Sequence, residues 1–301
     1  QAYEKYKSQN GEKPLDDGHI VKIPSVEVLG LTKDGLKRTS AEHIYKEHVE
    51  KLFRIKTKRG REIKVTGPHK LLSFEDGMKW KPAALLGKGD LIAYPKKLDY
   101  SGESSISCDD AYFLGLFAAE GSSNPLSICT GSTLLRDWLV NHVNSNHGYN
   151  PTVREDNRRD NAVYTILLRV ASHEVLSELV GTNSGTKMVP ESVLSGDNNL
   201  VEQFLAGYMD GDGHFADFYA SATTKSKDLA SGLSYLFLKL GMPSTLKSKF
   251  VKGNEFFRLS IVGEERSNLN ELPLKIKSCN YSGKNSAYGY SSAIVKHLQD
   301  V

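Results

Sequence analysis

Short runs of alternating apolar and polar residues dominate the first third of the chain. Five such runs lie between residues 26 and 95, and Gly, Pro, Asp and Lys residues typical of turns separate them. Alternation with a period of two is typical of strands that bury one face. We therefore expect residues 1–98 to form an all-β region. Residues 99–108, rich in Ser and poor in periodicity, are expected to be a linker.

Beyond residue 108, apolar residues recur three and four positions apart in segments that alternate with strand-like runs. The order is helix, strand, helix, strand, strand, helix, and the same order then follows again. Helices are expected at 109–120, 132–145, 172–180, 200–211, 225–240 and 263–272, and strands near 125–130, 151–155, 162–170, 214–222, 244–251 and 255–262. We infer one domain over 109–277 with halves 109–190 and 200–277. Residues 278–301 are expected to return toward the first region.

A gapless internal repeat supports the two halves. The ten residues 112–121 align with residues 204–213 at a constant offset of 92, and both copies end in an acid followed by glycine. Internal repeats indicate that one structural unit occurs twice. The two acids are Glu120 and Asp212, and we expect the glycine after each to take the left-handed conformation at a helix end.

Small residues four positions apart lie on one face of each repeated helix. They are Ala111, Gly115 and Ala119 in the first copy, and Gly207 and Gly211 in the second. A glycine inside a helix costs about 0.5 to 1 kcal/mol relative to alanine, so a compensating contact is expected. We predict that the two helices pack on each other through this face, which brings their terminal acids side by side.

Composition excludes several classes of protein. The 301 residues are 39% hydrophobic, which is enough for at least one sizeable core and excludes a disordered tail. The longest nearly unbroken apolar run, residues 111–119, is far shorter than the roughly 20 residues of a spanning helix, so we expect no membrane partner. The three cysteines form no CxxC pair, and the N-terminus lacks an apolar signal stretch. These features predict an intracellular, cytoplasmic location.

The charge is unevenly distributed along the chain. The formal net charge is +3, but residues 1–98 carry 21 Lys and Arg against 13 Asp and Glu, whereas residues 99–301 carry 18 against 23. A basic lobe is compatible with a polyanionic partner such as nucleic acid, although many solvated surfaces have the same balance.

Glu120 and Asp212 are the candidate chemical groups. A carboxylate at a helix C-terminus faces the negative end of the macrodipole, which is unfavourable by about 0.3 to 1 kcal/mol, and two close carboxylates repel each other. A divalent cation removes both costs, and magnesium prefers such oxygen ligands and serves phosphodiester hydrolysis. The alternative is a structural helix pair with solvated acids. The repeat of acid and glycine at matching positions favours the metal site.

The segments FLGLFAAEG (113–121) and LAGYMDGDG (205–213) resemble the two signature motifs of LAGLIDADG homing endonucleases. The resemblance implies an α+β fold with a pseudo-two-fold domain of two αβ halves, whose saddle-shaped antiparallel sheets lie on double-stranded DNA. It implies a monomer that hydrolyses phosphodiester bonds at a long asymmetric site. It also implies Mg2+ (or Mn2+) held by the carboxylates of Glu120 and Asp212 and the carbonyls of Ala119 and Gly211.

The same family uses a basic residue near each site, which orients water or stabilises developing charge. The resemblance implies Lys187 for one site. For the other it implies Lys277, which we choose over Lys275. A solvated loop lysine is the alternative for each.

Basic side chains on the expected strands are the candidate DNA contacts, because a strand that packs with one face presents the other face to the bases. Alternation places Lys247 and Lys249 on one face. Any one of these residues could be an ordinary surface residue. The full set is Arg154, Arg158, Arg159, Arg169, Lys225, Lys247, Lys249 and Arg258.

Residues 60–72, GREIKVTGPHKLL, resemble the block of inteins in which a Thr and a His activate the N-terminal splice junction. The resemblance implies a partial, Hint-like splicing domain within residues 1–98, with Thr66 and His69 as splicing residues. A histidine beside the scissile peptide can protonate the leaving amide nitrogen; the alternative is a turn histidine. An intein begins with Cys or Ser and ends with Asn, whereas this chain begins with Gln1 and ends with Val301. We expect a partial intein that does not splice as given.

The leading hypothesis is therefore a site-specific DNA endonuclease embedded in an intein, with the intein-free allele of the host gene as its target. The first motif departs from the family pattern, with Ala118 where the second has Asp210, and with Glu120 in place of the usual Asp. These departures could make the two strand cleavages unequal. The alternatives are a maturase-like nucleic-acid-binding module of the same fold, and a splicing protein whose nuclease has decayed.

Overall fold

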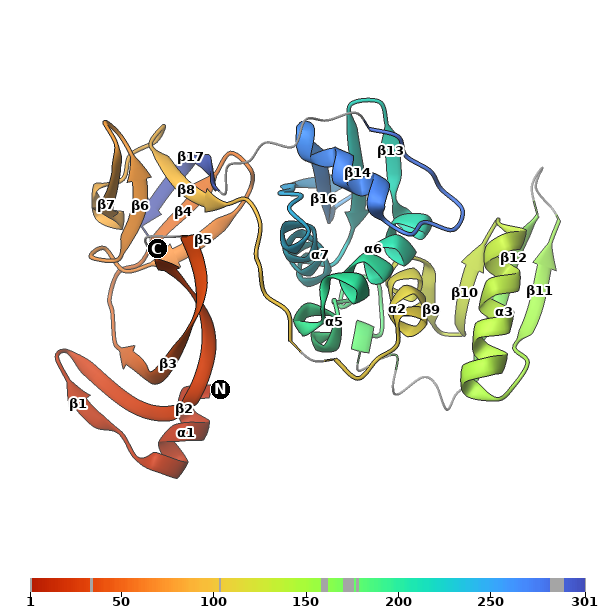
Figure 1. The fold of residues 1–301 in the computed structure, drawn as a ribbon, viewed down its shortest axis with the longest axis horizontal. Helices are drawn as coiled ribbons and strands as arrows, with labels where there is room; N and C mark the ends of the chain where they lie inside the picture. Colours follow the sequence, from red (N-terminus) through yellow and green to blue (C-terminus); the bar gives the residue numbers. More distant parts are fainter. Residues whose placement is uncertain are drawn as a thin grey trace. The chain divides into compact units, whose positions relative to one another are not determined.

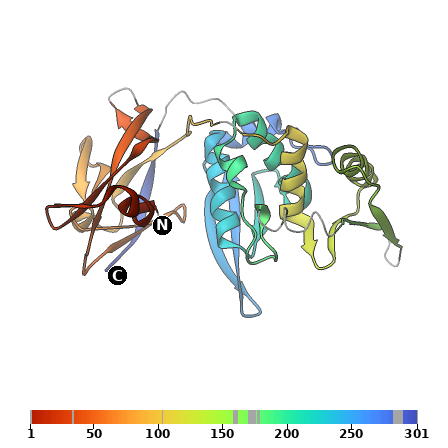
Figure 2. The same cartoon turned by 90° about the horizontal axis from the view of Figure 1, so that it is seen from below.

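The computed structural model describes residues 2–32, 35–102, 104–157, 162–169, 176, 179–281 and 290–300. The chain divides into two compact units, which can be followed in Figures 1 and 2. The first unit comprises Gln1–Pro95 and Gly289–Val301, and the second comprises Lys96–Tyr288.

The first unit consists mainly of two sheets. A three-stranded sheet has the order β1-β2-β3, and a six-stranded sheet has the order β5-β4-β17-β8-β6-β7. Its elements are α1 (Ala2–Asn10), β1 (Lys13–Leu15), β2 (Gly18–Thr32), β3 (Gly35–Glu47), β4 (Phe53–Thr57), β5 (Glu62–Val65), β6 (Lys70–Phe74), β7 (Met78–Pro82), the 3-10 helix η1 (Ala83–Leu85), β8 (Leu91–Pro95) and β17 (Tyr290–Asp300).

The last strand of the chain lies in the middle of the larger sheet. β17 pairs antiparallel with β4 on one side and with β8 on the other. Residues at least 195 positions apart in sequence (Pro95 and Tyr290 are the nearest pair) thus share one sheet, and the intervening chain forms the second unit. A small core of Ile55, Val65, Ala83, Leu86 and Ile92 packs this unit.

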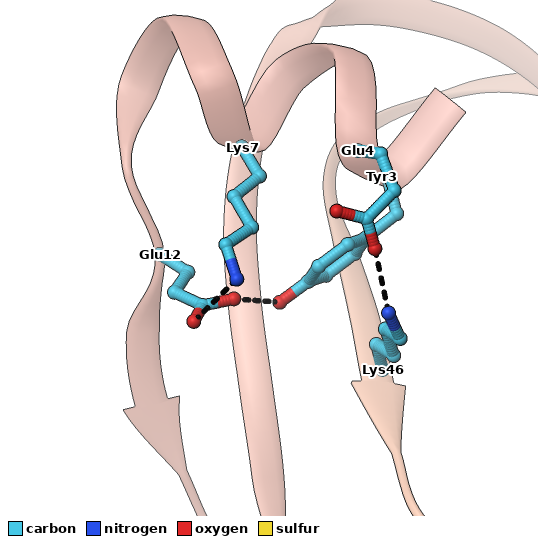
Figure 3. A network of polar contacts seen from close by, with 5 residues as sticks. All are labelled: Tyr3, Glu4, Lys7, Glu12 and Lys46. Carbon is cyan, nitrogen blue, oxygen red and sulfur yellow. Dashed lines mark hydrogen bonds and ion pairs between the residues drawn. The ribbon is translucent and has the colours of Figure 1, made fainter. Parts of the chain in front are cut away.

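The expectation of an all-β region is wrong at residues 2–10, which form helix α1. The segment has no apolar stripe, so periodicity does not reveal it. Polar side chains attach it to the neighbouring strands instead (Figure 3): Glu12 accepts hydrogen bonds from the Tyr3 hydroxyl at 2.8 Å and from Lys7 Nζ at 2.9 Å, and Lys46 Nζ reaches Glu4 at 2.6 Å.

The second unit is a mixed α/β structure built around helices α2 and α6. Two four-stranded sheets, with the orders β9-β10-β12-β11 and β13-β14-β16-β15, belong to the two halves. The elements are α2 (Cys108–Glu120), β9 (Gly121–Ser123), β10 (Leu126–Thr130), α3 (Thr133–His147), β11 (Thr152–Asp156), β12 (Val163–Leu167), α5 (Glu191–Ser195), α6 (Asn198–Asp212), β13 (His214–Ala216), β14 (Tyr219–Thr224), α7 (Lys227–Lys239), β15 (Thr245–Val251), β16 (Asn254–Val262) and the 3-10 helix η3 (Glu264–Glu271).

The repeat seen in the sequence is therefore a repeat of structure. Each motif helix is followed by two short antiparallel strands, a long helix, and two further strands, and the strand order is the same in both sheets. Two expectations differ in detail. The segment expected as an α-helix at 263–272 forms the 3-10 helix η3, and the segment expected as one strand at 214–222 falls in the two hairpin strands β13 and β14. Most of the expected helix over 172–180 lies outside the described residues.

Short polar side chains set where the long helices begin. Ser107, Ser132, Asp197 and Ser226 each precede a helix, and each side chain accepts a hydrogen bond from a backbone N–H three residues on. Such N-caps satisfy a donor that has no partner within the helix. Among the helices in the described part of the chain, none combines the length and apolar character that crossing a membrane requires.

Helices α2 and α6 approach each other at backbone distance, as predicted from the small residues. A Cβ atom added at Gly115 would lie 2.0 Å from the carbonyl oxygen of Phe204, and one added at Gly207 would lie 2.1 Å from that of Tyr112. Only glycine fits at either position. The contact lies inside one continuous core, in which Tyr112, Phe117, Phe204 and Tyr208 are among the largest fully buried side chains.

We expect Gly207→Ala to destabilise the protein by about 3 kcal/mol, because the added methyl overpacks against backbone. In an unconstrained helix the same change would be stabilising, so the sign is diagnostic. Gly131→Ala is the control, since its nearest neighbour would be 3.8 Å away. Chemical denaturation measures both, and equal free energies of unfolding for the two variants would contradict the close helix contact.

Candidate functional site

The two motif helices end side by side, each in an acid. A Cβ atom added at Gly211 would lie 2.6 Å from the Ala119 Cβ and 3.1 Å from the Glu120 Cγ, so the helices stay in contact up to their last residues. Most of the preceding residues of both helices are buried, whereas Glu120 and Asp212 reach solvent. Close helix packing thus presents two carboxylates together at one surface.

The glycines that follow the acids are required because there is no room for a side chain, not because of an unusual backbone conformation. Gly121 has φ −71° and Gly213 has φ −70°, so the expected left-handed conformation is wrong. A strand begins directly after each helix, which requires an extended backbone. A Cβ atom at either glycine would lie within 2.4 Å of a carbonyl oxygen of the preceding turn, that of Phe117 or Met209. Glycine is needed because any side chain would strike the helix it ends.

The Asp212 carboxyl lies in an environment that disfavours its charge. Partial burial and the neighbouring Glu120 raise the pKa of Asp212 from 3.8 to about 6, against the opposing effects of Lys187 and Lys277. Tyr208 also senses both acids, because burial, then Asp212 and Glu120, raise the pKa of its hydroxyl. That hydroxyl is fully buried and has no hydrogen-bond partner among the described residues.

Two lysines meet the carbonyl ends of the two helices. Lys187 Nζ donates to the carbonyl oxygens of Phe117 and Ala119, both at 3.2 Å. Lys187 is 7% exposed. Burial lowers its pKa, while Asp212 and Glu120 oppose that shift. A lysine at this end of a helix interacts favourably with the macrodipole.

Lys277 does the same on the other helix. Its Nζ donates to the carbonyl oxygens of Met209 at 3.0 Å, and of Gly211 and Gly213 at 2.7 Å each. Burial lowers the pKa of Lys277, and Asp210, Asp212 and Glu120 oppose the shift. Phe117 and Ala119 correspond to Met209 and Gly211 at the repeat offset of 92, so the two lysines occupy equivalent places.

Lys275 points elsewhere. Its ammonium lies 4.6 Å from the ring centre of Tyr112 and 5.0 Å from that of Trp138, which is a pair of cation–π contacts. The aromatic surface holds this side chain away from the helix carbonyls that bind Lys277. The geometry therefore favours Lys277 as the partner of the acids.

The sequence identifies Asp210 only as a member of the second motif, whereas the structure shows a specific set of contacts for it. It is 2% exposed and accepts hydrogen bonds from the Tyr112 hydroxyl and from the backbone N–H groups of residues 275–277. These contacts join residues at least 65 positions apart. No local spacing in the sequence points to them.

The donor set fits a hard divalent cation. Two carboxylates lie beside each other, and the carbonyl oxygens of Ala119 and Gly211 each accept a lysine bond while keeping a second lone pair. The raised pKa of Asp212 and the partnerless Tyr208 hydroxyl both indicate a place that gains from an added cation and its water. Among the described residues, no group of three or more His, Cys, Asp and Glu gathers at one point.

The outer face of the second sheet carries basic side chains. Lys247 pairs with Arg258 across strands β15 and β16, and Lys249 follows on the same face. Arg258 donates to the Ser221 hydroxyl at 3.1 Å and lies over the Tyr219 ring. Helix α7 packs on the opposite, apolar face of this sheet.

The first sheet is less basic in the part that is described. Arg154 lies on β11, paired with Thr165, and is exposed. Arg158 and Arg159 lie outside the described residues. Arg169 lies beyond the end of β12, with its guanidinium over the Tyr149 ring, so the structure does not bring it onto the sheet with Arg154. Lys225 is exposed just before α7.

Thr66 and His69 form the ends of a tight turn between β5 and β6. The His69 N–H donates to the Thr66 carbonyl at 3.2 Å. The turn is fixed to η1, because the Ala83 N–H donates to the His69 carbonyl at 2.8 Å and the Ala84 N–H to the Gly67 carbonyl at 3.1 Å. His69 itself is exposed, so its ring is accessible to another group.

A family profile described as the intein splicing domain matches residues 15–289. Among curated proteins, the chain is 28% identical over 254 residues to a small subunit of replication factor C from Methanocaldococcus jannaschii, and 29% identical over 279 residues to an A-type ATP synthase protein from Pyrococcus abyssi. Each match covers 81% of this chain but only 14% and 26% of the relative. The chain therefore spans a small part of these proteins.

Solved structures similar to the chain fall into two groups. The PabCDC21-1 intein has a TM-score of 0.27 at 28% identity, over 30% of this chain and 55% of its own. A mesophilic variant of the homing endonuclease I-DmoI has a TM-score of 0.44 at 13% identity, over 56% of this chain and 94% of its own.

We expect Asp212→Asn to raise the melting temperature at about pH 8 in buffer without divalent cations. Because the folded pKa of about 6 exceeds the ordinary 3.8, ionisation of Asp212 costs stability above that pKa. The wild type regains this stability as the pH falls through about 6 toward 4, so the advantage of the variant should shrink there. Thermal melts in EDTA across this range measure it. A variant that melts below the wild type at every pH would contradict the electrostatic argument.

Proposed function

The chain belongs to the family of intein splicing domains, and we propose that its second unit is a LAGLIDADG-type endonuclease that cuts double-stranded DNA at a specific site. The substrate is proposed to be the intein-free allele of the host gene, bound by a monomer whose two halves supply two cleavage centres.

One observation carries this proposal: the acids, carbonyls and lysines at the ends of α2 and α6 occur twice, in equivalent positions. A structural helix pair has no need for Glu120 and Asp212 at the ends where the macrodipole disfavours them. Lys187 and Lys277 approach those ends and partly offset the charge. Two acids and two lysines around one interface match a reaction that acts on two DNA strands.

The chain's own residues divide the chemistry of phosphodiester hydrolysis among them. Glu120 and Asp212, with the carbonyls of Ala119 and Gly211, are the residues that would hold Mg2+ or Mn2+. Such an ion polarises a phosphate and lowers the pKa of bound water. Lys187 and Lys277 supply positive charge beside the phosphate as negative charge develops on it.

The sheets supply the surface for DNA. Lys247, Lys249 and Arg258 share the face opposite α7, and Arg154 lies on the corresponding sheet of the first half. Lys and Arg side chains that neutralise DNA phosphates provide much of the salt-dependent affinity of protein–DNA complexes. A two-stranded β-ribbon can enter the major groove, where the four base pairs present different donors and acceptors.

The kinds of protein to which the chain is similar support an inserted element. A replication factor and an ATP synthase share no activity, yet the protein from each aligns with most of this chain over a small part of its own length. The shared segment is therefore proposed to be the intein, and no host activity is assigned to it.

In the first unit we propose Thr66 and His69 as splice-junction residues. The turn that joins them is bonded to η1 through the carbonyls of Gly67 and His69, which fixes the backbone that carries the imidazole. A histidine held in this way can protonate the leaving nitrogen of a peptide bond placed against it.

The direct test uses a supercoiled plasmid that carries the uninterrupted host allele, incubated with the protein and Mg2+. We expect linear product from the wild type and a rate at least about 100-fold lower for Asp212→Asn, because even outer-shell changes at metal sites cost 10- to 100-fold. Asp197→Asn, at the N-cap of the same helix, is the control, since asparagine is an equally good N-cap. A gel shift without cleavage by the wild type would instead identify a nucleic-acid-binding module.

A second test addresses the DNA surface. Replacing Lys247 and Lys249 by alanine should weaken binding of the same DNA and reduce the salt slope of the affinity by about 2, one for each lost phosphate contact. Lys227→Ala is the control, because it lies on α7, on the opposite face of the sheet. Titrations at several salt concentrations measure the slope, and equal slopes for both variants would count against this face.

A further inference from the structure

We propose that Asp210 is a positioning residue for Lys277, and that it therefore supports only one of the two strand cleavages. This inference rests on the proposed nuclease function. It concerns a residue next to the acid pair that is neither a metal ligand nor a contact of substrate.

The contacts of Asp210 account for its whole hydrogen-bonding capacity. One carboxylate oxygen accepts from the Tyr112 hydroxyl at 2.7 Å and the Lys275 N–H at 2.6 Å; the other accepts from the Ile276 N–H at 3.3 Å and the Lys277 N–H at 2.9 Å. A carboxylate accepts about four such bonds. Asp210 is 2% exposed and fully engaged, so it differs in role from the exposed Asp212 two residues later.

These bonds fix the backbone that carries Lys277. Three consecutive N–H groups, those of residues 275–277, converge on one buried side chain. The Lys277 side chain then returns to the end of α6, the helix from which Asp210 projects. Asp210 thus connects the helix end and the lysine segment into one rigid piece.

The opposite half has no such anchor among its described residues. At the repeat offset of 92, Ala118 stands where Asp210 does, and Phe204 stands where Tyr112 does. The hydrogen-bonded pair Tyr112–Asp210 on one side of the pseudo-two-fold is matched by the apolar pair Phe204 and Ala118 on the other. Both members of the pair differ together, as expected if the hydroxyl and the carboxylate serve one purpose.

Lys187 is held by different elements. Its carbonyl accepts a hydrogen bond from the Ser226 hydroxyl, the N-cap of α7, and its N–H donates to the Asn183 carbonyl at 3.1 Å. None of these contacts involves Asp210 or its counterpart Ala118. Loss of Asp210 therefore leaves these anchors of Lys187 in place.

Backbone anchoring matters more for Lys277 because its ammonium is saturated. It donates to three carbonyl oxygens, and an ammonium has three donors. To act on a phosphate or a water it must give up one of them, and a fixed backbone keeps it in place during the exchange. Lys187 donates to two carbonyls and faces no such exchange.

The test is cleavage of a duplex from the uninterrupted host allele, labelled on each strand separately. Lys277→Met and Lys187→Met first identify the strand that each lysine serves. Asp210→Asn places an amide NH2 where an acceptor is needed, so one or more backbone bonds are lost. We expect it to slow the Lys277 strand by about 10- to 100-fold, as misplacement of a reacting group does, and to leave the other strand within about threefold. The proposal would be overturned if Asp210→Asn slowed cleavage of both strands equally, or if it slowed the same strand as Lys187→Met.

Two further variants protect the test against misfolding. Tyr112→Phe removes one donor and reproduces the residue found at position 204, so it should slow the same strand by a smaller factor while keeping DNA affinity. It leaves the three backbone bonds of Asp210 in place and should therefore cost less stability than Asp210→Asn. Asp197→Asn should change neither strand. If Asp210→Asn fails to fold, the strand preference of Tyr112→Phe decides, and no preference would overturn the proposal.

Amide hydrogen exchange tests positioning without any cleavage. Asp210→Asn or Tyr112→Phe should speed exchange in residues 275–277 and leave residues 185–187 unchanged; unchanged exchange in 275–277 would refute the anchor. A wild type that cuts neither strand would refute the nuclease and with it the strand assignment, whereas a wild type that cuts both while Asp210→Asn shows no strand preference would refute only the role of Asp210.

Discussion

The contact between α2 and α6 is the constraint on which the candidate site depends. Gly115 and Gly207 let each helix lie against the other's backbone, with no room for even one methyl group. Because the approach is fixed in the helix middles, the helix ends have no freedom to separate. Glu120 and Asp212 are therefore neighbours by geometry, whatever their mutual repulsion. Burial, and then the neighbouring Glu120, raise the pKa of Asp212 to about 6.

Opposite charges meet at the helix ends, but both the acid Asp212 and the two lysines are held where their charged forms are disfavoured. Two helix C-termini converge there, and each adds partial negative charge to that of an acid. The two lysines counter the charge from the carbonyl side, but burial lowers their own pKa values, so they are also held in a state that disfavours their charge. Ionisable groups whose pKa values are shifted by burial and by neighbouring charges cluster at functional sites.

Sequence reasoning succeeded where the information is local or repeated. The period of apolar residues and the offset of 92 sufficed for the motif helices and their glycine contact. It failed where tertiary contacts decide. Helix α1 has no apolar stripe, and its attachment through Glu12 is not a local pattern. The conformation of Gly121 follows from the strand after it, and the partners of Asp210 lie at least 65 residues away.

The two halves reach the same placement of a lysine by different means. The second uses a buried carboxylate from its own motif helix, and the first uses the cap of α7 and a turn. A duplicated fold needs only the helix contact and the lysine positions to match, because those determine the geometry at the acids. The supports behind them are free to diverge. It follows that equivalent substitutions in the two motifs have unequal consequences. An apolar residue is accommodated at Ala118, whereas an apolar residue at Asp210 would remove the acceptor of three partly buried N–H groups.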